Sequence, residues 1–536
     1  MDDDVGMILE FTHADELQLL ALLASAAVLL ILAGSLRLPY PILLVLGGLV
    51  LGFGPGVPEV SLPPEIVLVG FLPPLLYVSA YFTGLRELRQ NLKEISLLAV
   101  GLVIVTMVGV ATVAHAVAGL SWPQAFILGA VVSPTDPLAA TAIGRRLGVP
   151  RRLIDVVEGE SLVNDGTALV LLRTAIAAAV TGSFSMWHAG WDLVLNISGG
   201  VAVGLAVGYI IRRIRRALDN PPLEVTIAFL TGYFAFVPAD VLGVSGVLAV
   251  VTAGVYMGWY TPELTTVQTR LQGRAFWEIF TFLLNAVLFG LVGLQLRPIL
   301  DDLSGTNGWS LVREAAIVVL AVLLLRIAWV FAVTGAARMV AARAGHAGRP
   351  WTHAAFISWN GMRGAVTIAA ALLIPLRTDT GAPLEGRDEI VFFAFAVVLG
   401  TLVVQGLTLP GVIRALGLEA DESGLEAEEA HARIRAAEAA LERLDELASE
   451  SWVADDTAAR VRGLYQFRID RFAARVDPTG DGKIERQSLK FQKLRRELLE
   501  AERHAVVELR NAGEISDEVM RLVERDLDLE VSRLDS

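Results

Sequence analysis

Two aspartates lie in strongly apolar sequence, where a carboxylate is costly. Asp165 lies within Leu153–Val180, a segment long enough to cross a bilayer as a helix. A carboxylate in such a segment costs roughly 2.5–3.5 kcal/mol on insertion scales, so it marks a functional site by default. Asp136 lies one predicted helix earlier, between Pro134 and Pro137. Two buried carboxylates beside a broken helix predict a site at which a small cation and a proton compete.

The two prolines predict a break in the helix that carries Asp136. Proline lacks an amide hydrogen and clashes with the preceding turn, and it disfavours helical geometry at the residue before it, here Ser133 and Asp136. At membrane depth such backbone is tolerated only where protein or a wet cavity surrounds it. We expect an extended break that presents carbonyls, the Thr135 hydroxyl and the Asp136 carboxylate. These hard oxygen ligands suit Na⁺ or Li⁺; the alternative is a proline kink with no ligand.

The next predicted helix presents a second polar face. Ser161 and Asp165 are four residues apart and share one face, while Glu160 and Asn164 share the adjoining one. We expect Asp165 to approach the break, with Ser161 adding a hydroxyl oxygen. Burial and a neighbouring negative charge both disfavour an ionised carboxyl group, so a proton can compete with a metal cation there. Exchange follows if either ligand permits the inward–outward transition and the empty site resists it, a condition that stays a hypothesis.

Glu160 points away from that site and needs a partner of its own. Arg326, in an apolar run, is the first choice, and Arg363, between Gly361 and Gly364, is the second. A buried ion pair fixes geometry without having to titrate. The alternative to a transport role is therefore that Glu160 and Arg326 only lock helices together.

The elements that position these residues are predicted to be thirteen membrane helices. Each is an apolar run long enough to span hydrocarbon, near 16–36, 40–56, 65–83, 95–119, 123–143, 153–180, 191–211, 223–239, 243–260, 275–295, 315–340, 352–375 and 389–413. The loops on one side hold 18 basic residues and those on the other hold four. Basic loops face the cytoplasm, so we expect the N-terminus outside and the C-terminus inside. The start, Met1–Asp4, is acidic, unlike a secretory signal, so we read the first run as a permanent helix.

Further ionisable residues fall inside the predicted spans: Asp155, Glu158, Arg173 and Glu278. For Asp155, Arg173 and Glu278 we favour end positions from which the side chain reaches the headgroups.

After about residue 416 the composition changes from apolar to Glu-, Arg- and Ala-rich, and this part carries −10 of the net charge of −13. We expect a soluble helical tail. The chain has no cysteine, which excludes disulfides and thiolate metal sites. We find no nucleophile–base arrangement or cofactor fingerprint, so we do not expect an enzyme.

Five segments, in this order, resemble the cation/proton antiporter-1 family, the sodium–proton exchangers. They are Thr135–Pro137, Glu160–Asp165, Arg326, Gly361–Val366 and Val403–Thr408. A further likeness, Phe71–Leu76 followed by Leu85–Arg89, resembles the bacterial branch. The resemblance covers the whole predicted membrane part, about three-quarters of the chain.

The resemblance implies an all-α polytopic fold and a homodimer. Residues 1–415 would form the membrane domain and 416–536 a cytoplasmic tail. A mobile core, near 95–180 and 315–413, would be built as inverted repeats with two broken, crossing helices. Dimerisation helices would lie near 16–83 and 191–295.

The resemblance also implies roles for residues. Asp165 would carry the ion and the proton, with Asp136, Ser161 and the Thr135 carbonyl as ligands of Na⁺. Asn164 would orient the site, and the presence of Asn164 in place of a second aspartate implies electroneutral exchange of one cation for one proton. Glu160–Arg326 would be the structural pair, and Arg363 a further core charge. Family members often carry an acid where this chain has Val78.

We therefore expect Na⁺ (or Li⁺)/H⁺ antiport in the cytoplasmic membrane, serving pH and sodium homeostasis. K⁺/H⁺ antiport is an alternative, because oxygen ligands serve both ions. A cation channel, or a sensor that signals through the tail, is an alternative of another class. The expected partners are monovalent cations, protons, the bilayer and a second copy of the chain, with neither nucleic acid nor a cofactor.

Overall fold

The computed structural model describes residues 28, 31–32, 39–54, 66–181, 186–303, 308–344, 350–377, 384–418, 423–476 and 483–534. The chain divides into two compact units, Met1–Ala420 and Asp421–Ser536.

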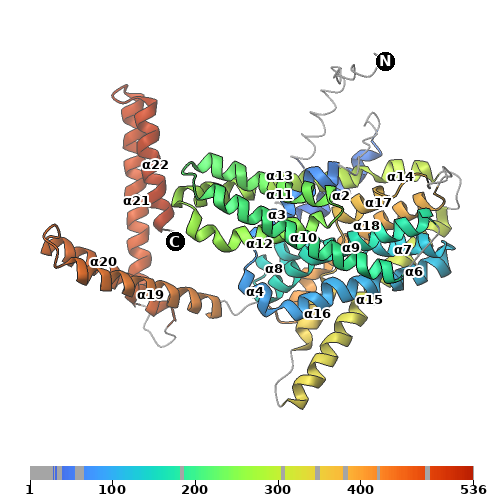
Figure 1. Ribbon diagram of the computed structural model, residues 1–536. Helices are drawn as coiled ribbons and strands as arrows, with labels where there is room; N and C mark the ends of the chain where they lie inside the picture. Colours follow the sequence, from blue (N-terminus) through green and yellow to red (C-terminus); the bar gives the residue numbers. More distant parts are fainter. Residues whose placement is uncertain are drawn as a thin grey trace. The chain divides into compact units, whose positions relative to one another are not determined.

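The described part of the first unit is built from helices (Figure 1). They are α2 (Tyr40–Gly52), the π-helical turn η1 (Ile66–Phe71), α3 (Leu72–Phe82), α4 (Leu85–Gln90), α5 (Leu92–Ser96), η2 (Leu97–Leu102), α6 (Val103–Ala118), α7 (Trp122–Val131), α8 (Leu138–Arg146), α9 (Arg151–Thr181), α10 (Met186–Arg215), α11 (Pro221–Val241), α12 (Gly246–Leu264), α13 (Val267–Leu294), α14 (Leu296–Asp302), α15 (Gly308–Arg343), α16 (Trp351–Trp359), α17 (Ala365–Leu372) and α18 (Arg387–Ala415).

Twelve of the thirteen predicted spans coincide with these helices or with pairs of half-helices. Seven helical segments in the described residues are long and apolar enough to cross a membrane by themselves, and three shorter apolar helices accompany them. The first predicted span, near 16–36, falls almost entirely outside the described residues. The total of thirteen therefore stays a prediction.

Two predicted spans are broken in the middle, as expected. The first is divided into α7 and α8 by the irregular stretch 133–137, which contains the two prolines. The second is divided into α16 and α17 by the irregular stretch 360–364. The two breaks meet, because the Asp136 amide donates a hydrogen bond of 2.8 Å to the Met362 carbonyl. Each break thus satisfies part of the backbone that the other exposes.

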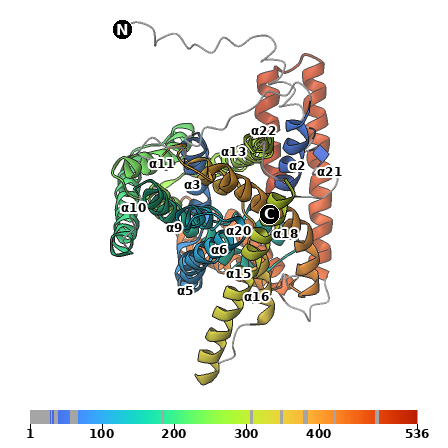
Figure 2. The same cartoon turned by 90° about the vertical axis from the view of Figure 1, so that its right-hand side faces the viewer.

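The helices pack as two groups. In one, α10, α11 and α12 pack on one another, α12 packs on α3, and α13 packs on both α11 and α2. In the other, α6 packs on α7 and α15, α7 packs on α9, and α18 packs on α15 and α17. Figure 2 shows α9 between α10 and α6. Helix α9 also contacts α3, α10 and α12. It therefore carries its polar residues along the boundary between the two groups.

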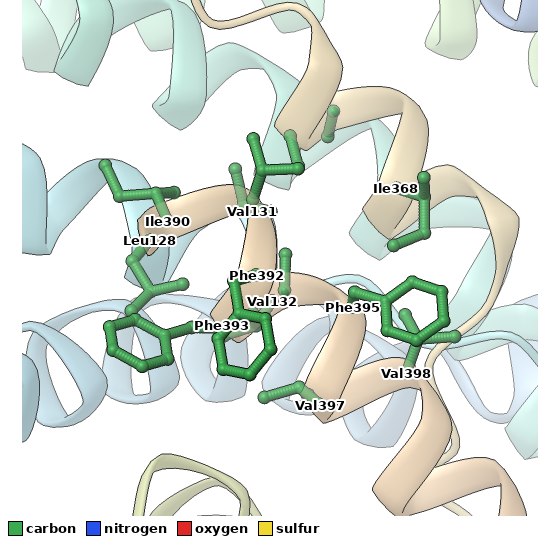
Figure 3. Close-up of a cluster of buried hydrophobic side chains, with 14 of the residues drawn as sticks. Leu128, Val131, Val132, Ile368, Ile390, Phe392, Phe393, Phe395, Val397 and Val398 are labelled. Carbon is green, nitrogen blue, oxygen red and sulfur yellow. The ribbon is translucent and has the colours of Figure 1, made fainter. Parts of the chain in front are cut away.

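A dry hydrophobic cluster holds the broken helices in place. Phe393, Phe395 and Val398 of α18 lie against Val131 of α7 and Ile368 of α17 (Figure 3). All five side chains are at most 2 % exposed. Burial of each such side chain contributes about 1.5–3 kcal/mol, so packing, rather than backbone regularity, fixes the half-helices.

One buried ion pair was missed by the sequence analysis. Glu224, in α11, is fully buried and lies 3.5 Å from Arg215 of α10, and it accepts a 3.1 Å hydrogen bond from Thr269. Glu224 sits at the start of the predicted span 223–239 but was not counted among the intramembrane charges. Its partner Arg215 falls beyond the predicted span 191–211, whereas α10 extends as far as Arg215, which is buried.

The second unit is also helical in its described residues. It contains α19 (Ser423–Leu447), α20 (Asp455–Val476), α21 (Lys483–Asn511) and α22 (Asp517–Leu534). Helices α19 and α20 pack as one pair and α21 and α22 as another, consistent with the predicted helical tail. The second pair carries ion pairs between exposed side chains, such as Arg495–Glu530 at 2.5 Å.

Candidate ion-binding site

The first break and α9 are joined by hydrogen bonds at Thr135. The Ser161 hydroxyl donates to the Thr135 carbonyl at 2.9 Å. The Asn164 amide donates to the Thr135 hydroxyl at 2.7 Å. All three side chains are buried. The residues that the sequence predicted at the site, on two separate helices, therefore lie together.

Asp136 lies at the N-terminal end of α8. Its carboxylate accepts a 3.0 Å hydrogen bond from the Leu138 amide, and the side chain is half-buried. The first amides of a helix have no partners within it and carry a partial positive charge. This helix end therefore stabilises the Asp136 carboxylate where the break opens.

Asp165 is the most weakly satisfied carboxylate of the site. It is 4 % exposed, and among the described residues its Oδ1 atom has no hydrogen-bond partner. The Oδ1 atom of Asn164 is buried and unpartnered as well. Asp136 lies near enough to Asp165 for the two negative charges to repel each other. Buried oxygens without partners are rare in folded proteins and need an explanation. Each of these two oxygens is an acceptor that a cation or a proton could satisfy.

Glu160 pairs with Arg326, the first choice from the sequence. The two guanidinium nitrogens lie 2.5 and 2.9 Å from the two carboxylate oxygens, in a bidentate arrangement. Arg326 also donates to the carbonyls of Ile357 and Asn360, at 3.0 and 2.9 Å. Both charged side chains are at most 1 % exposed. Arg326 thus ties α9 to the end of α16.

Arg363 lies in the second break and holds it to the first. Its Nε donates to the Val132 carbonyl at 3.0 Å, and its Nη1 donates to the Gly361 carbonyl. Its backbone amide donates to the Thr401 hydroxyl at 3.0 Å. Val132 ends α7, and a helix C-terminus carries partial negative charge. The positive charge of Arg363 therefore balances the partial negative charge at the C-terminal end of α7. Arg326 does the same at the C-terminal end of α16.

The five charges of this centre do not cancel. Among the described residues, the charged side chains gathered here are the acids Asp136, Glu160 and Asp165 and the bases Arg326 and Arg363. With all five groups ionised, the centre holds one net negative charge. One monovalent cation or one proton neutralises it.

Gly364 allows Asp136 to approach the second break. A Cβ atom at Gly364 would overlap the Asp136 carboxylate. We therefore expect Gly364→Ala to displace that carboxylate, to lose most transport and to cost about 1–3 kcal/mol of stability, as overpacking does. Cation-driven proton flux and the thermal unfolding midpoint measure the two effects. Gly411→Ala is the matched control, because a Cβ there meets no atom within 4 Å. Full flux in Gly364→Ala would contradict this role.

Two polar residues near Asp136 were missed. Tyr40 of α2 lies close enough to feel the charge of Asp136, and close to Asn285 of α13. Asn285 is 1 % exposed, and both of its amide atoms lack a hydrogen bond of good geometry within the described residues. The sequence analysis considered only ionisable side chains inside the spans. A lone asparagine in the run 283–287 was the signal that it passed over.

Three further residues that the sequence analysis named are Arg173, Val78 and Glu158. Arg173 is 57 % exposed and pairs with Asp240 at 2.5 Å, so it has a protein partner, and its predicted place at the headgroups stays a prediction. Val78 is buried in the hydrophobic cluster around α3, away from solvent. Glu158 pairs with Arg145 at 2.5 Å.

Residues 21–415 match the family model described as the transmembrane sodium/hydrogen exchanger. Among curated proteins, the chain is 37 % identical over 528 residues to an uncharacterised Na⁺/H⁺ exchanger of Mycobacterium tuberculosis, covering 96 % of this chain and 95 % of that one. It is 30 % identical to the Na⁺/H⁺ antiporter ApNhaP of Aphanothece halophytica, covering 91 % of each chain.

Among solved structures, the fold resembles the sodium proton antiporter MjNhaP1 of Methanocaldococcus jannaschii, solved at pH 8. The TM-score is 0.62 and the identity 20 %, with 76 % of this chain and 99 % of that chain covered. At this identity the likeness shows the fold alone.

Proposed function

From the premise that this chain belongs to the transmembrane sodium/hydrogen exchanger family, we propose that it exchanges Na⁺ or Li⁺ for H⁺, one for one. The observation that carries the proposal is the buried Asp165 carboxylate, unpartnered at Oδ1 and placed beside Asp136. The charge of this centre is balanced by a single cation or a single proton. Such balance makes the loaded states neutral and leaves the empty state charged.

The difference in charge couples the two fluxes. Moving a net charge through a low-dielectric boundary is costly, so the empty centre resists the inward–outward transition. Either Na⁺ or H⁺ on Asp165 removes that cost. Because both ligands occupy the same oxygens, they bind in turn, and one gradient drives the other ion.

We assign the other residues by what they touch. Asp136, the Ser161 hydroxyl and the Thr135 carbonyl supply further oxygens for Na⁺, and Asn164 orients Thr135. Oxygen ligands of this kind suit hard cations. Glu160 and Arg326 hold α9 against α16, and Arg363 holds the two breaks together.

We further propose that the second group of helices, with α6 to α9 and α15 to α18, moves against the first group during transport. Alternating access by rocking of one bundle against another is the common transporter scheme. The first group then forms the contact of a homodimer. The basic loops place the C-terminal unit in the cytoplasm, and the host membrane is the cytoplasmic membrane, where exchange serves pH and sodium homeostasis.

The test is proton flux in proteoliposomes with an imposed ΔpH. We expect Na⁺ and Li⁺ to collapse the ΔpH, and clamping the membrane potential at zero or at −100 mV (roughly 2.3 kcal/mol per moved charge) to leave the rate unchanged. Protein-free liposomes and choline are the controls. A rate that follows the potential would refute one-for-one exchange.

The same assay separates the alternatives. K⁺ as the best ion would make the protein a K⁺/H⁺ antiporter with the same site. Cation flux without proton movement would indicate a channel. An absence of cation-dependent proton movement between about pH 6 and 9, in well-folded protein, would indicate a sensor.

A further inference from the structure

A pocket lies outside the ion-binding centre, between α4 and α12. Its volume is about 290 Å³, and it is lined by Leu85, Arg86, Arg89, Gln90 and Trp259. Helix α4 connects α3, in the first group of helices, to α5 and α6, in the second. The pocket therefore lies against the segment where the chain passes from one group to the other.

Two positive charges in this pocket lack partners. Arg86 and Arg89 are exposed, and neither forms an ion pair or a hydrogen bond within the part of the chain that the structure describes. The acid of the same helix, Glu87, is not part of the lining. Its carboxylate lies against Gly84, and its charge reaches Asp155 of α9. The pocket is thus electropositive without internal compensation.

The pocket lies at the basic end of the membrane unit. Helix α4 packs beside the start of α9, and Arg152 donates to Asn91 at 3.2 Å just after α4. Trp259 is 55 % exposed, and exposed tryptophans concentrate at the level of the lipid headgroups. Phe82 and Leu92, which flank α4, are 56 % and 53 % exposed. Apolar side chains on either side of two arginines match the boundary between acyl chains and headgroups.

We propose that this pocket binds a phosphate group carried by the headgroup of an anionic lipid. Guanidinium groups match phosphate oxygens in a bidentate way, and the Gln90 amide adds a neutral donor. Trp259 covers the apolar part of the headgroup region. Basic pockets between helices on the cytoplasmic side bind anionic headgroups by the same chemistry. Soluble inorganic phosphate shares this chemistry and is the other source to distinguish.

The test is native mass spectrometry of the purified full-length protein with short-chain phosphatidylglycerol or phosphatidylcholine. We expect the wild type to retain one phosphatidylglycerol molecule in preference to phosphatidylcholine. Arg86→Gln/Arg89→Gln should bind it at least about tenfold more weakly, because charged hydrogen bonds are lost. Arg213→Gln/Arg216→Gln is the matched control, since both side chains are exposed and lie outside the pocket lining.

The outcomes discriminate between ligands. Retention of phosphatidylglycerol in excess inorganic phosphate supports the lipid. Its displacement by phosphate, with the same dependence on Arg86 and Arg89, would overturn the lipid as the source. Equal binding by the wild type and Arg86→Gln/Arg89→Gln would overturn the site itself. None of these residues touches the ion-binding centre, so failure here leaves the proposed antiport unaffected.

Discussion

Asp165→Asn is expected to reduce cation-driven proton flux to the level of protein-free liposomes. Asparagine has nearly the same shape but binds no proton at this position and carries no negative charge. The remaining charges of the centre, Asp136 and Glu160 against Arg326 and Arg363, then cancel without any bound ion. The empty site no longer resists the transition, and no carboxylate remains for the two ligands to share. The measurement is ΔpH collapse on addition of Na⁺, Li⁺ or K⁺.

Asp155→Asn is the matched control for this result. Asp155 lies on the same helix, α9, but is only half-buried near the helix start. We expect its flux to stay close to that of the wild type. Both variants should elute as one species and unfold at a similar temperature. Cation-dependent proton flux that persists in Asp165→Asn would overturn the assignment of the carrier.

The second large effect concerns stability. Arg326→Met is expected to lower the free energy of unfolding by about 3–5 kcal/mol, because it leaves Glu160 as a buried charge without its bidentate partner. It also removes the donors to the Ile357 and Asn360 carbonyls. The measurement is the midpoint of thermal unfolding in detergent, together with the yield of folded protein.

Glu160→Gln/Arg326→Met should be more stable than Arg326→Met alone. The double variant buries no unpaired charge, and Arg363 loses one attractive and one repulsive neighbour together. The coupling energy follows from the cycle of single and double variants. Arg173→Met is the control: its pair with Asp240 is about half exposed, so we expect a loss of about 0–1 kcal/mol. A double variant no more stable than Arg326→Met would show that the carbonyl contacts, not the charge pair, dominate.

The sequence by itself determined where carboxylates are costly and where one helix must break. Asp165 stands out because its segment is otherwise apolar over the length of a bilayer. Pro134 and Pro137 break the backbone wherever the helix packs, because the missing amide hydrogens are a property of the residues. The face shared by Ser161 and Asp165 follows from helical periodicity alone.

Only the tertiary structure decided which groups meet. The break at 360–364 contains no proline, so local chemistry did not predict it. Its backbone is satisfied by groups from other helices: the Thr401 hydroxyl accepts from the Arg363 amide, and the Asp136 amide donates to the Met362 carbonyl. Arg326 and Arg363 were both open as partners of Glu160, and the sequence distinguished them by rank alone. Helix packing puts Arg326 within reach of both carboxylate oxygens. The positions of Glu224 and Asn285 within predicted spans were visible in the sequence, but their burial and their neighbours were not. Side-chain types and their spacing are local, whereas partners across helices depend on how apolar faces such as that of α18 pack.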